Sequence, residues 1–206
     1  MFKRIALLLA LCGLGLARPA GAQGNAPASG GVVISEVAWA GTAASSSDEW
    51  IELHNPGATT VSLSGWQLTD GGDIIFVFAD IANIPPGGYF LLERTDDTTI
   101  YDIPADAIYV GGLNNTGETL SLLDGSGAPV DTANGDGGAW PGGLSTPPTS
   151  MERIDPLAPD SDSNWLSNDG LHRNGLDASG APINGTPRAA NLTVFPTQTP
   201  SATVSP

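Results

Sequence analysis

The sequence predicts an all-β protein, an antiparallel β-sandwich or barrel built as a single domain. Short runs of β-branched and aromatic residues alternate with clusters of Gly, Pro, Asn and Asp at intervals of about ten residues. Beyond the N-terminal stretch, no segment keeps the 3.6-residue apolar periodicity of an amphipathic helix. Many short strands separated by turns are typical of antiparallel sandwiches and barrels.

The first five strands are expected near residues 32–38, 49–55, 60–63, 66–70 and 74–79. VVISEVA opens with β-branched residues, and EWIELHN alternates apolar with polar side chains. The turn NPGAT leads into TVSL, and the glycine of LSGW bends the chain into WQLTD. The fifth run, IIFVFA, is apolar and follows the turn DGGD.

The second five strands are expected near residues 89–94, 107–110, 119–124, 128–133 and 150–154. The tight connection IPPGG leads into YFLLER, and turn residues bound the runs AIYV, TLSLLD and APVDTA. SMERI is the last candidate strand. The Gly- and Pro-rich segment before it, residues 134–149, is expected to form a mobile loop.

Composition divides the chain into four parts. Residues 1–22 have two basic residues near the start, Lys3 and Arg4, then an apolar run and finally the small residues AGA, the pattern of a secretory signal peptide. Residues 23–31 are a small-residue leader, residues 32–194 the β domain, and residues 195–206 a Pro/Thr/Ser-rich linker or tail. The apolar run is shorter than the roughly 18 residues of a membrane span. We therefore expect one exported domain, secreted or held at the cell surface.

The charge of the expected mature chain argues against nucleic-acid partners. Without residues 1–22 the chain has no cysteine and no lysine, and its four arginines face 22 acidic residues, a difference of −18 charges. Nucleic acids are bound largely through Lys and Arg that displace counterions from phosphates. The acidic surface therefore disfavours DNA, RNA and anionic lipid, and the lack of thiols excludes disulfides and thiolate metal sites.

The stretch from residue 48 to residue 70 combines carboxylates, a histidine and two tryptophans. Because successive side chains of a strand alternate between faces, Glu52 and His54 are expected to point to solvent or to a sheet edge. The side chains expected to turn inward together are Ile51, Leu53, Val61, Leu63, Trp66 and Leu68. This register predicts a scaffold whose charged residues are exposed.

The alternative for these polar residues is an active site. Glu36 and Glu52 on paired strands would be the two carboxylates of a glycosidase, or His54 would be a general base for a serine. Such groups need a pocket that shifts their pKa values, and a strand face rich in Glu, Ser and Thr gives no sign of one. His172 lies in the remote loop GLHRNG and is expected at the surface. The sequence therefore favours a scaffold without catalytic residues.

Seven blocks of sequence follow one another over about residues 32–192: VISEVAWAG, DEWIELHNPGATTVSLSGWQLTDG, IPPGGYFLLE, LNNTGETLSLLDGSGAPVDTA, SMERI, NW and GTPRAAN. In this order and spacing they resemble the lamin tail domain in its bacterial, secreted form. The resemblance implies an immunoglobulin-like β-sandwich that is not itself catalytic and that tethers or binds, often beside secreted hydrolases. Arg188 stands where the last block of this family usually has glycine, so the local turn is expected to differ. The basic, DNA-contacting surface of nuclear lamin relatives is not transferred, because this chain has the opposite charge.

Acidic clusters make Ca²⁺ a candidate cofactor, since it prefers oxygen ligands. Asp160, Asp162 and Asn164 imitate the start of an EF-hand loop, but Trp165 replaces the turn glycine and Leu171 the bidentate glutamate. The other candidate ligands flank one hairpin: Asp70, Asp73 and Asp80. Solvated acidic turns are the alternative.

Tryptophans suggest a second kind of site. Trp39 and Trp140 are candidate binding residues that would stack on a sugar, whereas Trp165 is expected to be packed. Trp140 lies among glycines in GGAWPGG, which favours exposure and hence a contact role. The alternative is that Trp140 folds back as a plug over one end of the sandwich.

The leading functional hypothesis is an exported, non-catalytic binding or tethering module that recognises a protein or a cell-surface polymer. One alternative is a carbohydrate-binding module that uses exposed tryptophans and is stabilised by Ca²⁺, with a surface polysaccharide as ligand. The other is an accessory domain of a secreted hydrolase.

Overall fold

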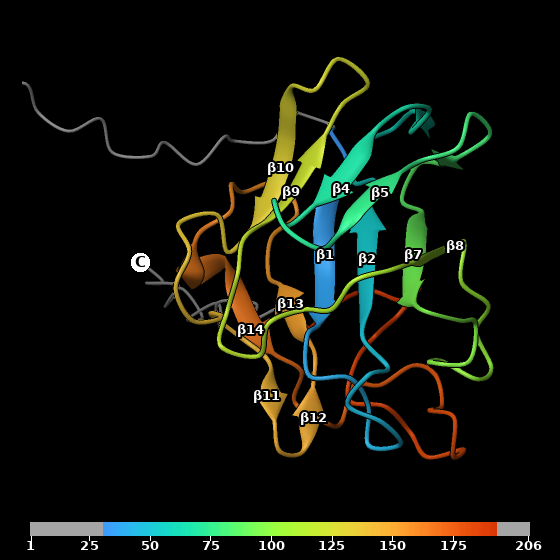
Figure 1. Ribbon diagram of the computed structural model, residues 1–206, viewed down its shortest axis with the longest axis vertical. Coiled ribbons are helices and arrows are strands. Elements are labelled where there is room, and N and C mark those ends of the chain that lie inside the picture. The colour runs from blue at the N-terminus through green and yellow to red at the C-terminus, as the bar shows by residue number, and fades with distance from the viewer. Residues whose placement is uncertain (1–30, 193–206) are drawn as a thin grey trace, which may run out of the picture.

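A computed structural model describes residues 31–192, which form a two-layer β-sandwich (Figure 1). The larger layer is a six-stranded sheet in the order β14-β13-β1-β2-β7-β8, and the smaller is a four-stranded sheet in the order β10-β9-β4-β5. Strand pairs in both sheets are antiparallel except β7 with β8, which is parallel. The predicted all-β sandwich is therefore confirmed. The expected signal peptide and tail, and all but the last residue of the leader, lie outside the described residues.

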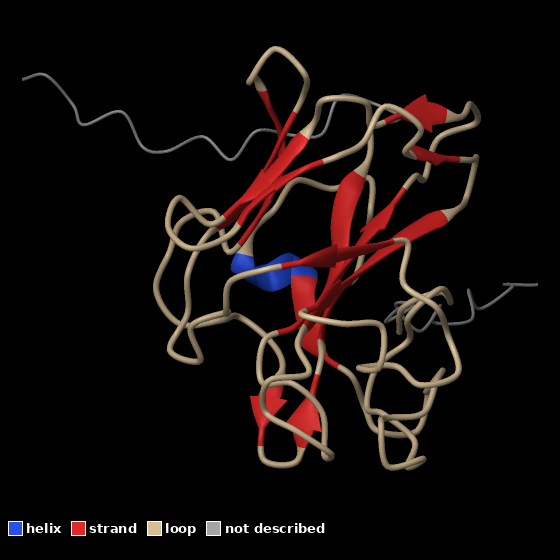
Figure 2. Ribbon diagram, turned by 45° about the vertical axis from the view of Figure 1, so that its right-hand side comes forward, coloured by secondary structure: helices blue, strands red, loops and turns tan. Residues whose placement is uncertain are grey.

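The strands are short, and most are bounded by turns. The larger sheet contains β1 (Val33–Ala38), β2 (Trp50–His54), β7 (Tyr89–Arg94), β8 (Ala107–Tyr109), β13 (Met151–Arg153) and β14 (Trp165–Ser167). The smaller sheet contains β4 (Gln67–Thr69), β5 (Ile75–Val77), β9 (Leu120–Leu123) and β10 (Pro129–Ala133). Two small ribbons pair β3 (Val61–Ser62) with β6 (Asn83–Ile84) and β11 (Leu144–Ser145) with β12 (Pro148–Thr149). The 3₁₀-helix η1 (Asp162–Asn164) is the short helix drawn in Figure 2.

Each of the ten expected runs contains an observed strand. The strands outside those runs are β6, β11, β12 and β14, which have two or three residues each and so carry no periodic signal. The loop expected at residues 134–149 contains the β11–β12 ribbon. Within the described residues, no helix has the length and apolar character needed to cross a membrane.

The main core lies between the two sheets and confirms most of the predicted inward residues. Ile51, Leu53, Leu63 and Leu68 are fully buried. The remaining two, Val61 and Trp66, are half-buried and pack against the same cluster. Inward alternation on β2 and β4 is therefore sufficient to place both strands over one core.

A second, smaller core lies on the outer face of the larger sheet. There Trp50 and Leu91 pack with Ile100 and Ile183, which come from two long loops. Residues 168–192, the stretch after β14, contribute to this cover and end the described chain. The outer face of the larger sheet is thus covered by loops, and this position defines the candidate site.

Candidate functional site

Three glutamates lie side by side on the outer face of the larger sheet. Glu36 on β1 is paired with Glu52 on β2 and with Glu152 on β13, and cross-strand neighbours project from the same face. All three are 0% exposed. The prediction that Glu52 points to solvent is therefore wrong. Alternation assigned Glu52 to the correct face, but that face is covered by the C-terminal loops rather than by water.

The C-terminal segment, residues 185–192, is bonded to this row of glutamates. Glu36 Oε1 accepts hydrogen bonds from the Ser150 hydroxyl at 2.6 Å and from the Thr186 amide at 2.9 Å. The Thr186 hydroxyl lies 3.1 Å from both Glu36 Oε2 and Glu152 Oε1. Glu152 Oε2 accepts the Leu192 amide at 2.8 Å. The carboxyl groups therefore hold the segment against the sheet.

Gly185 shows how closely the segment approaches the sheet. A Cβ atom at this position would lie 2.7 Å from Trp50 Cζ2 and 2.9 Å from Glu36 Oε1, distances that real side chains do not tolerate. Only a residue without a side chain fits, so the glycine of the block GTPRAAN is explained by packing.

Arg188 occupies the position where the resembled family usually has glycine. Its φ is 58°, in the left-handed region that glycine adopts more readily than other residues. Its amide donates to Glu52 Oε2, and its guanidinium binds Asp106 at 2.7 Å and the Pro104 carbonyl at 3.1 Å. These contacts compensate for the strain of a left-handed non-glycine residue.

Burial determines the protonation state of two of the glutamates, Glu36 and Glu52. Burial, and then the charges of Glu152 and Glu52, raise the pKa of Glu36 well above its ordinary value. Burial also raises the pKa of Glu52 well above its ordinary value, against the opposing Arg188 amide and charge. Glu52 Oε1 is buried and accepts no hydrogen bond among the described residues. Burial therefore favours the protonated form of Glu36 and Glu52.

The geometry of this row differs from that of a hydrolase. A glycosidase keeps its two carboxyl groups on either side of a space for the substrate. Here Glu36 and Glu52 accept the amides of the chain's own residues Thr186 and Arg188, and both side chains are buried.

The contacts of the His54 ring are made outside the row of three glutamates. Its ring stacks on Tyr89 with centroids 4.6 Å apart, and Nδ1 lies 3.1 Å from the Gly88 carbonyl oxygen. Burial lowers the pKa of His54. It lines a hollow of about 100 Å³ together with Ser35, whose hydroxyl donates to the Glu52 carbonyl. This hollow contains neither the Glu36 nor the Glu52 side chain among its lining residues, so it does not gather the proposed catalytic groups.

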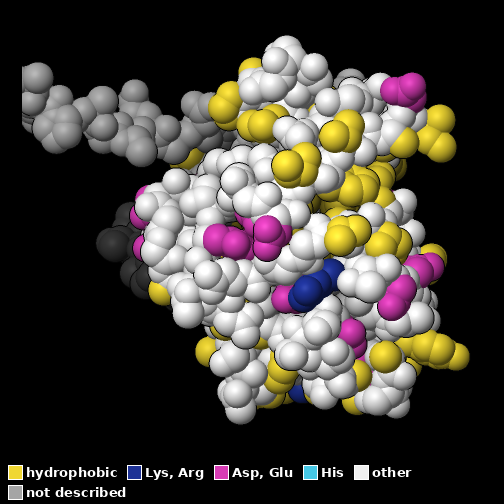
Figure 3. Space-filling view, in the orientation of Figure 1, with side chains coloured by type: hydrophobic (Ala, Val, Ile, Leu, Met, Phe, Trp, Pro, Cys, Tyr) yellow, Lys and Arg dark blue, Asp and Glu magenta, His cyan; other side chains and the backbone are white. Residues whose placement is uncertain are grey.

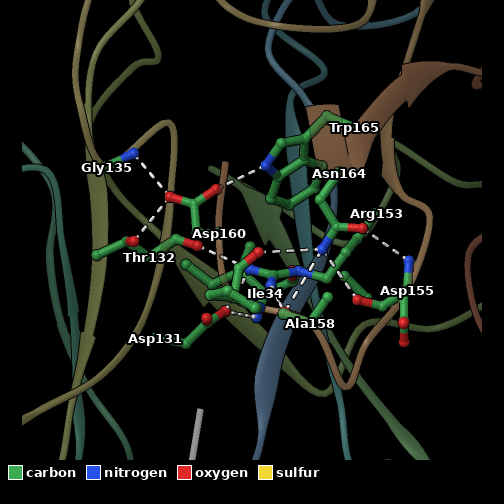
Figure 4. Close-up of polar contacts among 12 residues, drawn as sticks. Ile34, Asp131, Thr132, Gly135, Arg153, Asp155, Ala158, Asp160, Asn164 and Trp165 are labelled. Carbon is green, nitrogen blue, oxygen red and sulfur yellow. Dashed lines mark hydrogen bonds and ion pairs between the residues drawn. The ribbon is translucent and has the colours of Figure 1, made fainter. Parts of the chain in front are cut away.

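A buried ion pair links the two sheets (Figure 4). It lies on the face of the larger sheet opposite to the three glutamates. Arg153 on β13 donates to Asp131 Oδ2 on β10 at 2.6 Å, and both side chains are inaccessible to solvent. The same guanidinium donates to the carbonyls of Ile34, Thr132 and Ala158, and it lies 4.8 Å from the Trp165 ring centroid. Asp131 Oδ2 also accepts the Ile34 amide at 2.8 Å.

Buried acids have one function in common across the domain: each accepts a backbone amide of a neighbouring loop or strand. The acid-to-amide pairs are Glu36–Thr186, Glu52–Arg188, Glu152–Leu192, Glu49–Leu113, Glu93–Thr99, Asp131–Ile34 and Asp177–Ser179. Sequence reasoning missed Glu49, Glu93, Asp131, Glu152 and Arg153. The sequence signal for these residues was an acid or an arginine inside a short strand run, as in SMERI. Such a residue can lie either at the exposed surface or on a buried face of the sheet.

The proposed calcium string is not arranged as a ligand set. Asp160 accepts the Thr132 hydroxyl, the Gly135 amide and the Trp165 indole N–H, as Figure 4 shows. The Asn164 side-chain oxygen accepts the Asp155 amide, and the Asp162 side chain is exposed. Over residues 31–192, no group of three or more His, Cys, Asp or Glu side chains is placed to hold a metal ion.

Two acids of the hairpin at residues 70–80 accept hydrogen bonds from the chain itself. Asp70 Oδ1 accepts the Gly72 and Ile74 amides, and Asp80 accepts the Ser64 hydroxyl. His172 is exposed, as expected, and pairs with Asp169 at 2.8 Å.

The two candidate binding tryptophans lie one behind the other. Trp39 is only 7% exposed, and its indole N–H donates to the Gly142 carbonyl at 2.9 Å. Trp140 is half-buried, stacks parallel to Trp39 with ring centroids 6.4 Å apart, and donates to the Asn114 carbonyl. The expectation that Trp39 is an exposed aromatic is therefore wrong, while Trp140 covers the core as a plug. Trp165 is packed, as expected.

Comparison with known protein families identifies the family of this chain. Residues 25–135 match the family described as Lamin Tail Domain. The matched range contains β1 to β10 and ends before β13 and β14, which complete the larger sheet. No curated protein matches this chain.

Proposed function

Because the chain belongs to the lamin tail domain family, an immunoglobulin-like fold, we propose that it is an exported, non-catalytic module that binds a protein or a cell-surface polymer. The observation that carries this proposal is the use of the buried acids. Groups that could have served as acids, bases or nucleophile partners instead fix loops to the sheet. Superfolds of this kind host many functions, so function depends on the particular residues of the site.

The surface charge supports a basic or neutral partner. All 22 acids and four arginines of the chain beyond residue 22 lie in the described domain, and one of those arginines is buried against Asp131. A strongly acidic surface repels phosphate backbones and anionic lipid and attracts basic segments of proteins.

The proposal can be tested with residues 23–206 attached to a resin. Envelope and culture-supernatant fractions of the source organism are passed over it, and retained proteins and glycans are identified. We expect specific retention that competes with soluble domain. A parallel screen for glycosidase, phosphatase, nuclease and esterase activity should be negative. Hydrolysis that disappears in Glu52→Gln, while the variant keeps its melting temperature, would falsify the non-catalytic part.

A further inference from the structure

The outer edge of the smaller sheet, strand β5, has unpaired backbone groups. Its pairing with β4 runs from Ile74, whose carbonyl accepts the Asp70 amide at 3.3 Å, to Phe78, whose amide donates to the Trp66 carbonyl at 2.9 Å. In an antiparallel ladder alternate residues bond to the same neighbour. The N–H and C=O groups of the two intervening odd-numbered residues, Ile75 and Val77, therefore point away from β4, where the sheet has no further strand.

The side chains of this edge are also unpartnered. Ile75 is 65% exposed and Val77 is 60% exposed, and their spacing of two residues puts both on the outer face. Figure 3 shows apolar side chains gathered on the part of the molecule that contains β4 and β5. The opposite edge of the sheet is protected, because β10 begins with Pro129, which has no amide to donate. The β5 edge contains neither proline nor lysine.

Acidic residues flank the edge and indicate what can pair with it. Asp70 and Asp73 precede β5, Asp80 follows it, and their carboxyl groups lie at or near the surface. A second copy paired edge to edge would bring these acids close to their equivalents, which like-charge repulsion opposes. The chain's own residues 193–206 do not match either, because they have three prolines and no basic residue. Charge complementarity instead requires an extended segment with Lys or Arg on both sides of alternating apolar residues.

We propose that the β5 edge binds an extended, basic-flanked segment of a partner protein by strand addition. This inference rests on the proposed function and specifies it, because it names the binding edge and the chemistry of the partner. Main-chain hydrogen bonds to Ile75 and Val77 would supply affinity, and the exposed Ile75 and Val77 side chains would select alternating apolar residues.

The probe is a fluorescent peptide of alternating valine and threonine with two lysines at each end, titrated into the domain by fluorescence polarisation. Val77→Pro removes an outward amide while leaving the bonds to β4 in place, so it should fold. We expect it to weaken binding about tenfold, the effect of one lost main-chain bond. Val77→Lys, which places a cation at an exposed position of the edge, should weaken binding at least as much. Leu157→Thr, which changes an exposed apolar residue elsewhere, should leave binding unchanged.

Two further measurements identify the edge and the charge effect. Amide hydrogen exchange should slow at Ile75 and Val77 when the peptide binds. The double variant Asp73→Asn/Asp80→Asn should bind more weakly and show less dependence on salt. Equal binding by wild type, Val77→Pro and Val77→Lys would overturn the proposal, as would self-association of wild type that Val77→Lys abolishes, since a second copy would then be the occupant.

The same variants separate this inference from the proposed function. If wild-type domain and Val77→Lys retain the same partner from envelope fractions, the module binds but not through β5. If wild type retains nothing, the binding function itself fails. Peptide binding that is lost in Val77→Pro, together with retention of a basic-flanked protein by wild type alone, supports both.

Discussion

Arg153→Met is expected to lower the free energy of unfolding by about 3–5 kcal/mol, because removal of one partner leaves a buried charge uncompensated. The guanidinium donates to Asp131 and to three carbonyl groups, and its side chain has no contact with solvent. Methionine fills a similar volume, so little of the loss comes from a cavity. For a domain of this size, the change corresponds to a fall in melting temperature of about 10 °C.

The pH dependence of this loss follows from Asp131. Burial raises the pKa of Asp131 to about 6, and the Arg153 charge opposes that rise. In Arg153→Met the pKa rises further, so at pH 5 the carboxyl is neutral and its burial costs less. The stability deficit should therefore be larger at pH 8 than at pH 5. Urea unfolding followed by tryptophan fluorescence at both pH values measures it.

A neutral pair provides the control. Arg153→Met combined with Asp131→Asn removes both charges and keeps an oxygen that can accept the Ile34 amide. The double variant should recover a substantial part of the loss, and its stability should depend less on pH than that of the single variant. A single variant within 1 kcal/mol of wild type would contradict the proposed cost of an uncompensated buried charge. A double variant as unstable as the single one at pH 8 would contradict it as well.

Four other outcomes are expected. Burial raises the pKa of Glu93 to about 7, so the folded state keeps a proton that the unfolded chain releases. The free energy of unfolding should therefore be greatest in mild acid and fall as pH rises through 7. Urea midpoints at pH 5 and pH 8 in the opposite order would contradict this. Glu52→Gln removes a buried titrating group and should flatten that profile, which a repeat of the titration measures; an unchanged slope would count against a raised pKa of Glu52. Trp140→Ala should cost about 2 kcal/mol and shift the emission of the uncovered Trp39 to longer wavelength, whereas an unchanged spectrum would exclude the plug. A chelator should leave the melting temperature unchanged, because Asp160 already accepts three hydrogen bonds; a clear fall would restore calcium as a ligand.

Local patterns in the sequence were sufficient for ten of the strands and for most of the main core, but not for the short strands β6, β11, β12 and β14. Alternation placed Ile51 and Leu53 inward and Glu52 outward from that core, as the structure has them. Turn residues such as the Pro-Gly pairs marked where strands end. The family blocks added the sandwich topology, which a period of two cannot give.

Local patterns could not show that the outer face is covered. Glu36 bonds to Thr186, 150 positions later, and Glu52 to Arg188, 136 positions later. The alternation of side chains along a strand assigns each side chain to a face of the sheet. It gives no information about what covers that face. The same limit hid the Arg153–Asp131 pair, in which each residue had the ordinary appearance of a surface charge. Trp39 was misjudged because the Gly-rich segment that covers it gives no apolar signal of its own.

The position of β1 has a consequence for how the polypeptide reaches its native state. One neighbour of this first strand, β13, follows it by more than a hundred residues, and the bonds over the outer face of β1 come from Thr186. Contacts between such distant positions form slowly, because their loop-closure entropy is lost before they add stability. The larger sheet can be completed only after β13 has been synthesised, so its closure is a late step of folding.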